Sequence, residues 1–179
     1  MSTKFEDIYS TKKNKVYNLA LHYAQNKEDA EEIMQNVFVS VFQNHEKFKE
    51  EATIDTWIYR ITINKSIDFL KAKKRKKRLG PLYNLFFDDT FNIRHDTKGF
   101  DHPGVLFEQQ EAVKHIFVQL NLLPERQKTV LILCKIEHQS IEKVAEILSL
   151  SPKATESLLQ RAKVNLQKRL VQNEGKKPE

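Results

Sequence analysis

Apolar residues in this chain recur at spacings of three and four positions, which is the period of an amphipathic α-helix. The clearest run begins after Asn26, a good helix N-cap, with Glu28 and Asp29 placed to suit the positive end of the helix dipole. Alternation of apolar and polar residues, the mark of a strand, is scarce. The pattern predicts an all-α fold. The apolar face of this helix comprises Ala30, Ile33, Met34, Val37, Phe38, Val41 and Phe42.

The opposite face of the same helix is mostly polar. Periodicity alone indicates that this face is simply solvated. Its residues are Glu31, Glu32, Gln35, Asn36, Val39, Ser40 and Gln43.

A second helix is predicted between Phe48 and Arg78, and it is apolar on two sides. Ile54, Ile58 and Ile61 lie to one side, and Ile63, Ile67 and Leu70 lie to the other. A helix with two apolar faces should be wedged between neighbouring elements. At about 100° per residue, the strip between the two faces holds Trp57, Arg60, Asn64 and Lys71.

This strip leads into a basic block, Lys71–Arg78, in which seven of eight residues are Lys or Arg. A ring for stacking, polar groups for base edges and cations for phosphates are what a single nucleic-acid strand needs. The alternative is that Trp57, the only tryptophan, belongs to the core and that the basic run is a solvated helix end. The combination of ring, guanidinium, amide and basic block favours nucleic acid.

A helix-turn-helix pattern occupies the C-terminal third of the chain. Pro124 can open a helix that runs to about Lys135, and Ser140 can cap the short helix that follows. That short helix has Ile141, Val144, Ala145 and Leu148 on one face. The dipeptide Ser149-Leu150 would make the turn, although a glycine is usual in the place of Ser149.

The last helix of this pattern would be capped by Ser151, with Pro152 in its first position. Helical hairpins that bind no DNA share such a pattern, so the pattern alone leaves both readings open. The face expected to be buried comprises Thr155, Leu158, Leu159, Ala162, Leu166 and Leu170. The outward face comprises Lys153, Glu156, Ser157, Gln160, Arg161 and Lys163.

Gly80-Pro81 and Pro103-Gly104 bracket a segment in which the helical period fails, which indicates two domains joined by a flexible linker. The boundaries are an N-terminal helical domain at 1–79, a linker at 80–104, a C-terminal helix-turn-helix domain at 105–172 and a disordered tail at 173–179. Within the linker, Tyr83–Phe87 should pack on the first domain, and Phe91 should meet a partner.

Composition narrows the functional classes. The chain has 179 residues, a formal net charge of +6 and a pI of about 9.3, which favours a polyanionic partner without choosing among DNA, RNA and acidic membrane. Its single cysteine, Cys134, cannot form an internal disulfide, and no apolar run is long enough to span a membrane. We therefore expect a cytoplasmic protein.

No catalytic constellation emerges from the remaining polar residues. The six histidines are scattered without ligand spacing, and no glycine-rich phosphate loop is present. We expect no metal, no cofactor, no small-molecule substrate and no enzymatic activity.

With these residues in view, the chain resembles bacterial RNA polymerase sigma factors of the extracytoplasmic-function class. Three segments carry the resemblance: Asp29–Phe38, Phe48–Leu70 with Thr56-Trp57-Ile58-Tyr59-Arg60-Ile61 and Asn64 inside it, and Leu123-Pro124-Glu125-Arg126-Gln127 through Lys163. The family helix matched by the first segment binds the polymerase β′ clamp. The second captures and melts the −10 promoter element, and the third reads the −35 element.

The resemblance implies three sets of binding residues and changes the interpretation of the polar helix face. The partners implied are core RNA polymerase (its β′ and β subunits), double- and single-stranded promoter DNA and an anti-sigma factor. Polymerase contacts would come from Glu32, Gln35 and Asn36. Contacts to the −10 element would come from Phe48, Trp57, Arg60, Asn64, Lys71, Lys73 and Lys74. Contacts to the −35 element would come from Lys153, Thr155, Glu156, Ser157, Gln160, Arg161 and Lys163.

Two other functions compete with the sigma-factor hypothesis. One is a stand-alone helix-turn-helix transcriptional regulator, and the other is an RNA-binding adaptor. A regulator needs no single-strand surface, so the Phe48–Arg78 segment argues against it.

Overall fold

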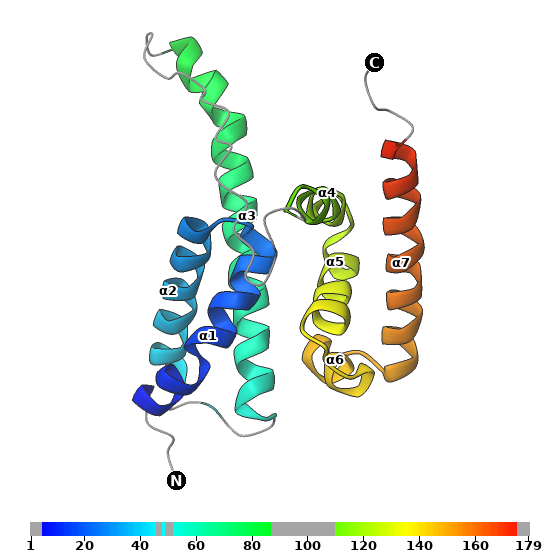
Figure 1. Ribbon diagram of the computed structural model, residues 1–179. Helices are drawn as coiled ribbons and strands as arrows, with labels where there is room; N and C mark the ends of the chain where they lie inside the picture. Colours follow the sequence, from blue (N-terminus) through cyan, green and yellow to red (C-terminus); the bar gives the residue numbers. More distant parts are fainter. Residues whose placement is uncertain (1–4, 46–47, 49–51, 87–109, 175–179) are drawn as a thin grey trace.

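The computed structural model describes residues 5–45, 48, 52–86 and 110–174. Within these ranges the secondary structure is helical and no strand occurs, which confirms the predicted all-α class. The fold has two small helical domains, one built from α1 to α3 and the other, a helix-turn-helix domain, from α4 to α7 (Figure 1).

The N-terminal domain packs three helices around one apolar cluster. These are α1 (Phe5–Ala24), α2 (Lys27–Asn44) and α3 (Ile54–Phe86). As predicted, Asn26 caps α2, because its side chain accepts a hydrogen bond of 2.9 Å from the amide of Asp29. The cluster comprises Ile8, Val16, Ala20, Leu21, Ala30, Ile33, Val37, Phe38, Val41 and Ile58.

The structure corrects the expected apolar face of α2 at Phe42. Its side chain is 61% exposed, although the sequence period places it with the buried residues. It stands near the end of the helix, where its ring packs edge to face with Phe5 at 5.2 Å between centroids and stacks on His45 at 6.0 Å.

Helix α3 is wedged between two apolar clusters, as its two apolar faces predict. Ile58 belongs to the cluster of the N-terminal domain, whereas Ile63 belongs to a second cluster shared with the C-terminal domain. The buried hydroxyls of Thr62 and Ser66 donate to the carbonyls of residues 58 and 62, so α3 buries these polar groups without leaving them unpaired.

The structure also corrects where α3 ends. The sequence predicts that helical periodicity stops at Gly80-Pro81, yet α3 continues through both residues to Phe86. Proline restricts the residue before it partly through that residue's Cβ, and glycine has none. The assignment of 80–104 as a linker stays a prediction, and its residues 87–104, with Phe87 and Phe91, lie outside the described residues.

The C-terminal domain comprises α4 (Gln110–Asn121), α5 (Glu125–Leu131), the π-helical turn η3 (Ile132–Ile136), α6 (Ile141–Leu148) and α7 (Pro152–Glu174). Both predicted caps form: the Ser140 hydroxyl accepts from the amide of Lys143, and the Ser151 hydroxyl accepts from the amide of Ala154. The helix expected from Pro124 to about Lys135 is present, with Pro124 as its N-cap and its second half widened into η3.

The turn between α6 and α7 forms despite its unusual residue. Ser149 has φ 53° and ψ 49°, the left-handed conformation that glycine adopts at least cost. The amide of Leu150 donates to the carbonyl of Ala145, which closes the end of α6 in the manner of a Schellman motif. The predicted tail at 173–179 begins inside α7, and 175–179 lie outside the described residues.

The two domains pack on one another through a common apolar cluster. Leu19, Tyr23, Tyr59 and Ile63 of the N-terminal domain meet residues of every helix from α4 to α7 in this cluster. Burying a large apolar side chain contributes about 1.5–3 kcal/mol. The contact between the domains therefore contributes substantially to the stability of this arrangement.

Candidate nucleic-acid interface

The proposed single-strand surface runs along α3, and Trp57 and Phe48 form its aromatic end. Their ring centroids lie 5.1 Å apart with an interplanar angle of 37°. Trp57 is half-buried and packs against the core of the N-terminal domain. The ring is thus partly a core residue, as the alternative held, and partly available at the surface beside a second aromatic ring.

Arg60, one turn further along α3, is directed at the C-terminal domain. Its Nε donates to the carbonyl of Ile147 at 3.1 Å, and its Nη2 donates to the carbonyl of Glu146 at 2.6 Å. These carbonyls lie in the last turn of α6, where a helix leaves acceptors unpaired and has the negative end of its dipole. Arg60 therefore acts as a cationic cap for α6.

Asn64 follows on the same strip, and its side chain is exposed. With Arg60 it lines a cavity of about 360 Å³. The opposite wall of this cavity belongs to the C-terminal domain and includes Glu125, Arg126, Thr129 and Ser149. The amide expected to meet a DNA base therefore faces a space enclosed by both domains.

The three lysines assigned to the basic end of the strip have different surroundings. Lys71 forms an ion pair with Glu125 of α5 at 3.1 Å, with both side chains about half exposed. Lys73 forms an ion pair with the buried carboxylate of Asp29 at the start of α2, so it fastens α3 to its own domain. Lys74 is exposed, as are Arg75 and Lys76. Among the described basic side chains of this strip, Lys74, Arg75 and Lys76 are thus the most accessible to phosphate.

The polar face of α2 is open. Glu32, Gln35 and Asn36 are exposed on the side of the helix away from the core. Val39, on the same face, is also 55% exposed. A polar patch with an apolar member is typical of a protein-binding surface, and Val39 adds an apolar contact to the three residues named from sequence.

Helix α7 presents the outward face that the helix-turn-helix pattern predicts. The side chains of Lys153, Glu156, Ser157, Gln160, Arg161 and Lys163 are exposed. Thr155 is fully buried, and its hydroxyl donates to the carbonyl of Ser151 at 3.0 Å. This burial confirms the inner face expected for Thr155 with Leu158 and Leu159, and it leaves the Thr155 side chain out of reach of a −35 element in this structure.

Sequence reasoning missed the residues that join the two domains. The carboxylate of Glu137, which follows η3, lies 3.0 Å from Nε2 of His22 and accepts a hydrogen bond of 3.2 Å from the hydroxyl of Tyr59. The hydroxyl of Tyr23 donates to that of Thr129 at 2.8 Å, across 106 positions in the sequence. None of these residues stands out from the pattern of the residues around it in the sequence, so only the tertiary structure shows that they join the domains.

Lys128 is the most strongly perturbed lysine at this junction. Its ammonium lies 4.7 Å from the centre of the Tyr23 ring and donates to the Tyr23 carbonyl and the Asn121 side chain. Burial lowers the pKa of Lys128 to about 8, and the nearby charge of Lys74 adds to this effect. A buried lysine with these partners serves to join helices rather than to bind an outside ligand.

In the described part of the chain, no group of three or more His, Cys, Asp or Glu side chains could hold a metal ion. Cys134 packs beside the shared cluster, and burial raises the pKa of its thiol, which disfavours the reactive thiolate. Within the same ranges, no helix is both long and apolar enough to cross a membrane.

Comparison with known protein families identifies the family of this chain. The family model for sigma-70 region 2 matches residues 8–76, which contain α2 and most of α1 and α3. The model for sigma-70 region 4 matches residues 116–166, which contain α5, α6 and much of α7. A probable RNA polymerase sigma factor of Haemophilus influenzae is 31% identical over 148 residues, which are 77% of this chain and 75% of that protein. The chain belongs to the RNA polymerase sigma factors.

Two further relatives place it within that family. The ECF sigma-E factor of Haemophilus influenzae is 27% identical over 93% of this chain and 87% of its own. The ECF sigma factor SigW of Bacillus subtilis is 28% identical over 93% and 88%. This sigma factor is therefore of the extracytoplasmic-function class, and the stand-alone regulator is not favoured.

Solved structures agree in fold. CnrH, in complex with the cytosolic domain of CnrY, superimposes with a TM-score of 0.63 at 19% identity, over 93% of this chain and 86% of that one. The sigma factor RpoE of Bartonella quintana, in complex with the anti-sigma factor NepR, gives 0.61 at 18% identity, over 93% and 96%. At such identities the likeness shows the fold alone.

Proposed function

We propose that this sigma factor docks on core RNA polymerase through the outward face of α2, melts the −10 element with α3 and reads the −35 element with the outward face of α7. The proposal rests on one observation: the chain has two surfaces whose chemical groups suit different forms of DNA. One has rings, an amide and a basic end, and the other is the open face of a capped recognition helix.

Trp57 on α3 and Phe48 before it offer ring surface, Asn64 offers an amide, and Lys74, Arg75 and Lys76 offer positive charge. Unstacking a base costs a few kcal/mol, and stacking it on a protein ring returns about 1–3 kcal/mol. A small aromatic site, acting together with the binding energy of polymerase, is therefore adequate to hold an opened strand without ATP.

On α7, the early residues of the helix suit base edges in the major groove, because a recognition helix contacts bases through its N-terminal part. Lys153, Glu156 and Gln160 are the exposed candidates there, and Arg161 suits a phosphate. The face of α2 that carries Glu32, Gln35 and Asn36 is the corresponding candidate for the polymerase β′ clamp.

In this proposal the protein acts by binding and is not itself an enzyme, since polymerase carries out the chemistry. Its place of action is the cytoplasm, and its partners are core polymerase with its β′ and β subunits, promoter DNA and an anti-sigma factor. The two similar solved structures support an anti-sigma factor as a partner. CnrH was solved with the cytosolic domain of CnrY, and RpoE was solved with the anti-sigma factor NepR.

Run-off transcription with purified core polymerase tests the proposal. The template is a library of duplex promoters with randomised −35 and −10 elements. We expect transcripts only when the chain and core polymerase are both present, and enrichment of one sequence at each element. Tight binding to duplex DNA without polymerase, together with no transcript, would instead identify a stand-alone regulator. Binding to RNA alone would identify the adaptor.

A further inference from the structure

The cavity between α3 and the C-terminal domain, about 360 Å³ in volume, has a lining that the proposed function uses only in part. Arg60 and Asn64 belong to its α3 wall, whereas Arg126, Thr129 and Ser149 line the other wall. Small-molecule sites in proteins have volumes of about 300–1,000 Å³. The cavity is therefore large enough for a small ligand, and both domains supply its lining.

The apolar part of this lining comes from both walls. Ile63 and Ile67 lie one turn apart on α3, and Ile147 and Leu148 stand at the end of α6. Aliphatic side chains on two sides of a space suit a flat ring, because both faces of the ring then contact apolar atoms. The cavity thus favours a molecule with a planar ring.

Two polar groups of the lining can fix the orientation of such a ring. Asn64 offers an exposed amide, which donates and accepts and so matches the N6 and N7 positions of adenine. Thr129 is buried, and its hydroxyl oxygen accepts from the hydroxyl of Tyr23 at 2.8 Å. The proton of the Thr129 hydroxyl therefore remains available to a bound molecule.

The charge around the cavity is positive. The guanidinium of Arg126 is exposed, and no carboxylate in the described ranges forms an ion pair with it. Glu125, the acidic residue of the lining, is already paired with Lys71 at 3.1 Å. Because a guanidinium binds two oxygens of a phosphate at once, Arg126 is well suited to hold a phosphate group.

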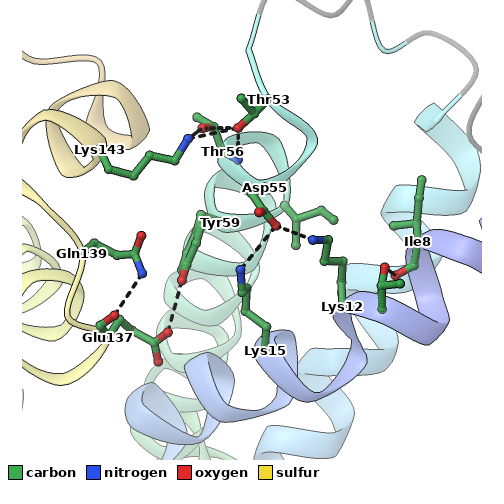
Figure 2. Close-up of polar contacts among 12 residues, drawn as sticks. Ile8, Lys12, Lys15, Thr53, Asp55, Thr56, Tyr59, Glu137, Gln139 and Lys143 are labelled. Atoms are coloured by element: carbon green, nitrogen blue, oxygen red, sulfur yellow. Dashed lines mark hydrogen bonds and ion pairs between the residues drawn. The ribbon is translucent and has the colours of Figure 1, made fainter.

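Contacts outside the cavity hold its two walls at a fixed separation. Lys143 of α6 donates to the hydroxyl of Thr53 at 3.0 Å, and Glu137 accepts from the hydroxyl of Tyr59 at 3.2 Å. Figure 2 shows Lys143 reaching Thr53 and Thr56 at the start of α3, and Glu137 meeting Tyr59 further along the same helix. The cavity is therefore formed before a ligand binds, as small-molecule sites usually are.

We propose that this cavity binds a purine nucleoside monophosphate, with the base between the aliphatic side chains of α3 and α6, the base edge at Asn64 and the phosphate at Arg126. The volume lies near the lower end of the range for such sites, which limits the ligand to a single nucleotide. The inference goes beyond the proposed function, because the ligand is a free nucleotide and much of the site belongs to residues with no assigned DNA contact.

Two exposed residues of the lining allow the phosphate and the base to be tested separately. Arg126→Gln removes the guanidinium, and Asn64→Ala removes the amide. Arg161→Gln is the control, because it removes the same charge from an exposed arginine of α7 that does not line the cavity. Helical circular dichroism of all three variants should match wild type, since exposed substitutions cost little stability.

Isothermal titration calorimetry with AMP, in the absence of polymerase and DNA, provides the test. We expect wild type and Arg161→Gln to bind AMP alike, and Arg126→Gln to bind it at least about tenfold more weakly, because a charge-assisted hydrogen bond is lost. Adenosine, which lacks the phosphate, should bind wild type more weakly than AMP, and Arg126→Gln should weaken it no further. Asn64→Ala should weaken AMP but not ribose 5-phosphate, which lacks the base.

Three results would overturn this site. They are no binding of AMP to wild type at millimolar concentration, equal weakening of AMP by Arg126→Gln and by the control, and binding of ribose 5-phosphate as tight as that of AMP. The second would indicate general attraction between charges, and the third an anion site with no place for a ring. The run-off assay reports separately on the proposed function, so either proposal can fail without the other.

Discussion

The surfaces of α3 and α7 carry comparable groups for binding nucleic acid, yet their surroundings differ. On α3, Arg60 and Lys71 are bonded to the C-terminal domain, and Asn64 faces a cavity between the domains. On α7, Lys153, Glu156 and Gln160 are exposed. The surface proposed to hold opened DNA is therefore covered in this structure, whereas the surface proposed to read duplex DNA is accessible.

This difference shows that a helix can carry the groups needed to bind nucleic acid without those groups being accessible. The groups on α3 follow from helical spacing and are readable in the sequence. Their availability depends on residues about 80 to 90 positions away, such as Glu146 and Ile147, which bond to Arg60. The covering of α3 by the C-terminal domain cannot be seen by examining either surface alone.

The largest expected effect is on the open surface. Gln160→Ala should change which −35 sequences are tolerated, by about 1–3 kcal/mol if a bidentate base contact is lost. Gln167→Ala, an exposed glutamine two turns further along α7, is the matched control and should leave the preference unchanged. A randomised −35 library transcribed with each variant measures this. A uniform fall in output with no change of preferred sequence would remove Gln160 from the reading face.

The next effect concerns the junction that covers α3. The pKa of Lys128 is about 8 when folded, against an ordinary value of 10.5. Between these values the unfolded chain keeps a proton that the folded chain has lost, so stability rises with pH. From pH of about 8 to about 9.5 the free energy of unfolding should rise by about 2 kcal/mol.

Lys128→Met tests this because it removes the titrating group and keeps an apolar stem of similar length. Denaturant unfolding at the two pH values should give a flat response for the variant. The range stops at about pH 9.5 because burial raises the pKa of Tyr23 and of Tyr59 above the ordinary 10.0, which lowers stability at higher pH. An equal rise in the variant would assign the pH dependence to other groups.

A smaller effect is expected at the covered surface. Asn64→Ala should reduce promoter opening about tenfold, because one base contact is lost from the strand held on α3. Binding to core polymerase should not change, since Asn64 lines the cavity beside α5 and α6 and is not part of the exposed α2 face. Permanganate footprinting on duplex promoter measures opening, and Asp68→Ala, also exposed on α3, is the control. Normal opening by the Asn64 variant would exclude it from the site.

The smallest effect separates two neighbouring lysines. Lys74→Gln should weaken binding on every promoter alike and reduce the salt dependence by nearly one unit of slope, because an exposed lysine contributes charge to phosphate. Lys73→Gln should instead lower stability, because its ion pair with buried Asp29 is broken. Salt titrations and thermal unfolding of both variants decide this, and exchanged behaviours would contradict it.

The sequence predicted what local physics determines. The caps at Asn26, Ser140 and Ser151, and the two-sided burial of α3, follow from side-chain chemistry within one or two turns, and all are present. Phe42 shows the limit of this approach. For Phe42 the period suggested burial, but the end of α2 offers it too little to pack against.

What the sequence could not predict is set by packing between distant segments. Glu146 reads as an exposed acid on an amphipathic helix, and nothing near it indicates that Thr56 will meet its carboxylate. The π-helical turn η3 likewise has no local signal in the apolar run from Val130 to Cys134. Such features follow from how helices dock, which hydrophobic period does not encode.

The central claim is that α3 holds the −10 strand while α7 reads the −35 element, and in this structure Arg60 and Asn64 of α3 face the C-terminal domain. Spin labels on cysteines replacing Asn14 of α1 and Gln167 of α7, both exposed, would report the distance between the domains once Cys134 is changed to serine. We predict one narrow, short distance in the free chain and a longer one when core polymerase and promoter DNA are bound. An unchanged distance distribution on binding would contradict the claim.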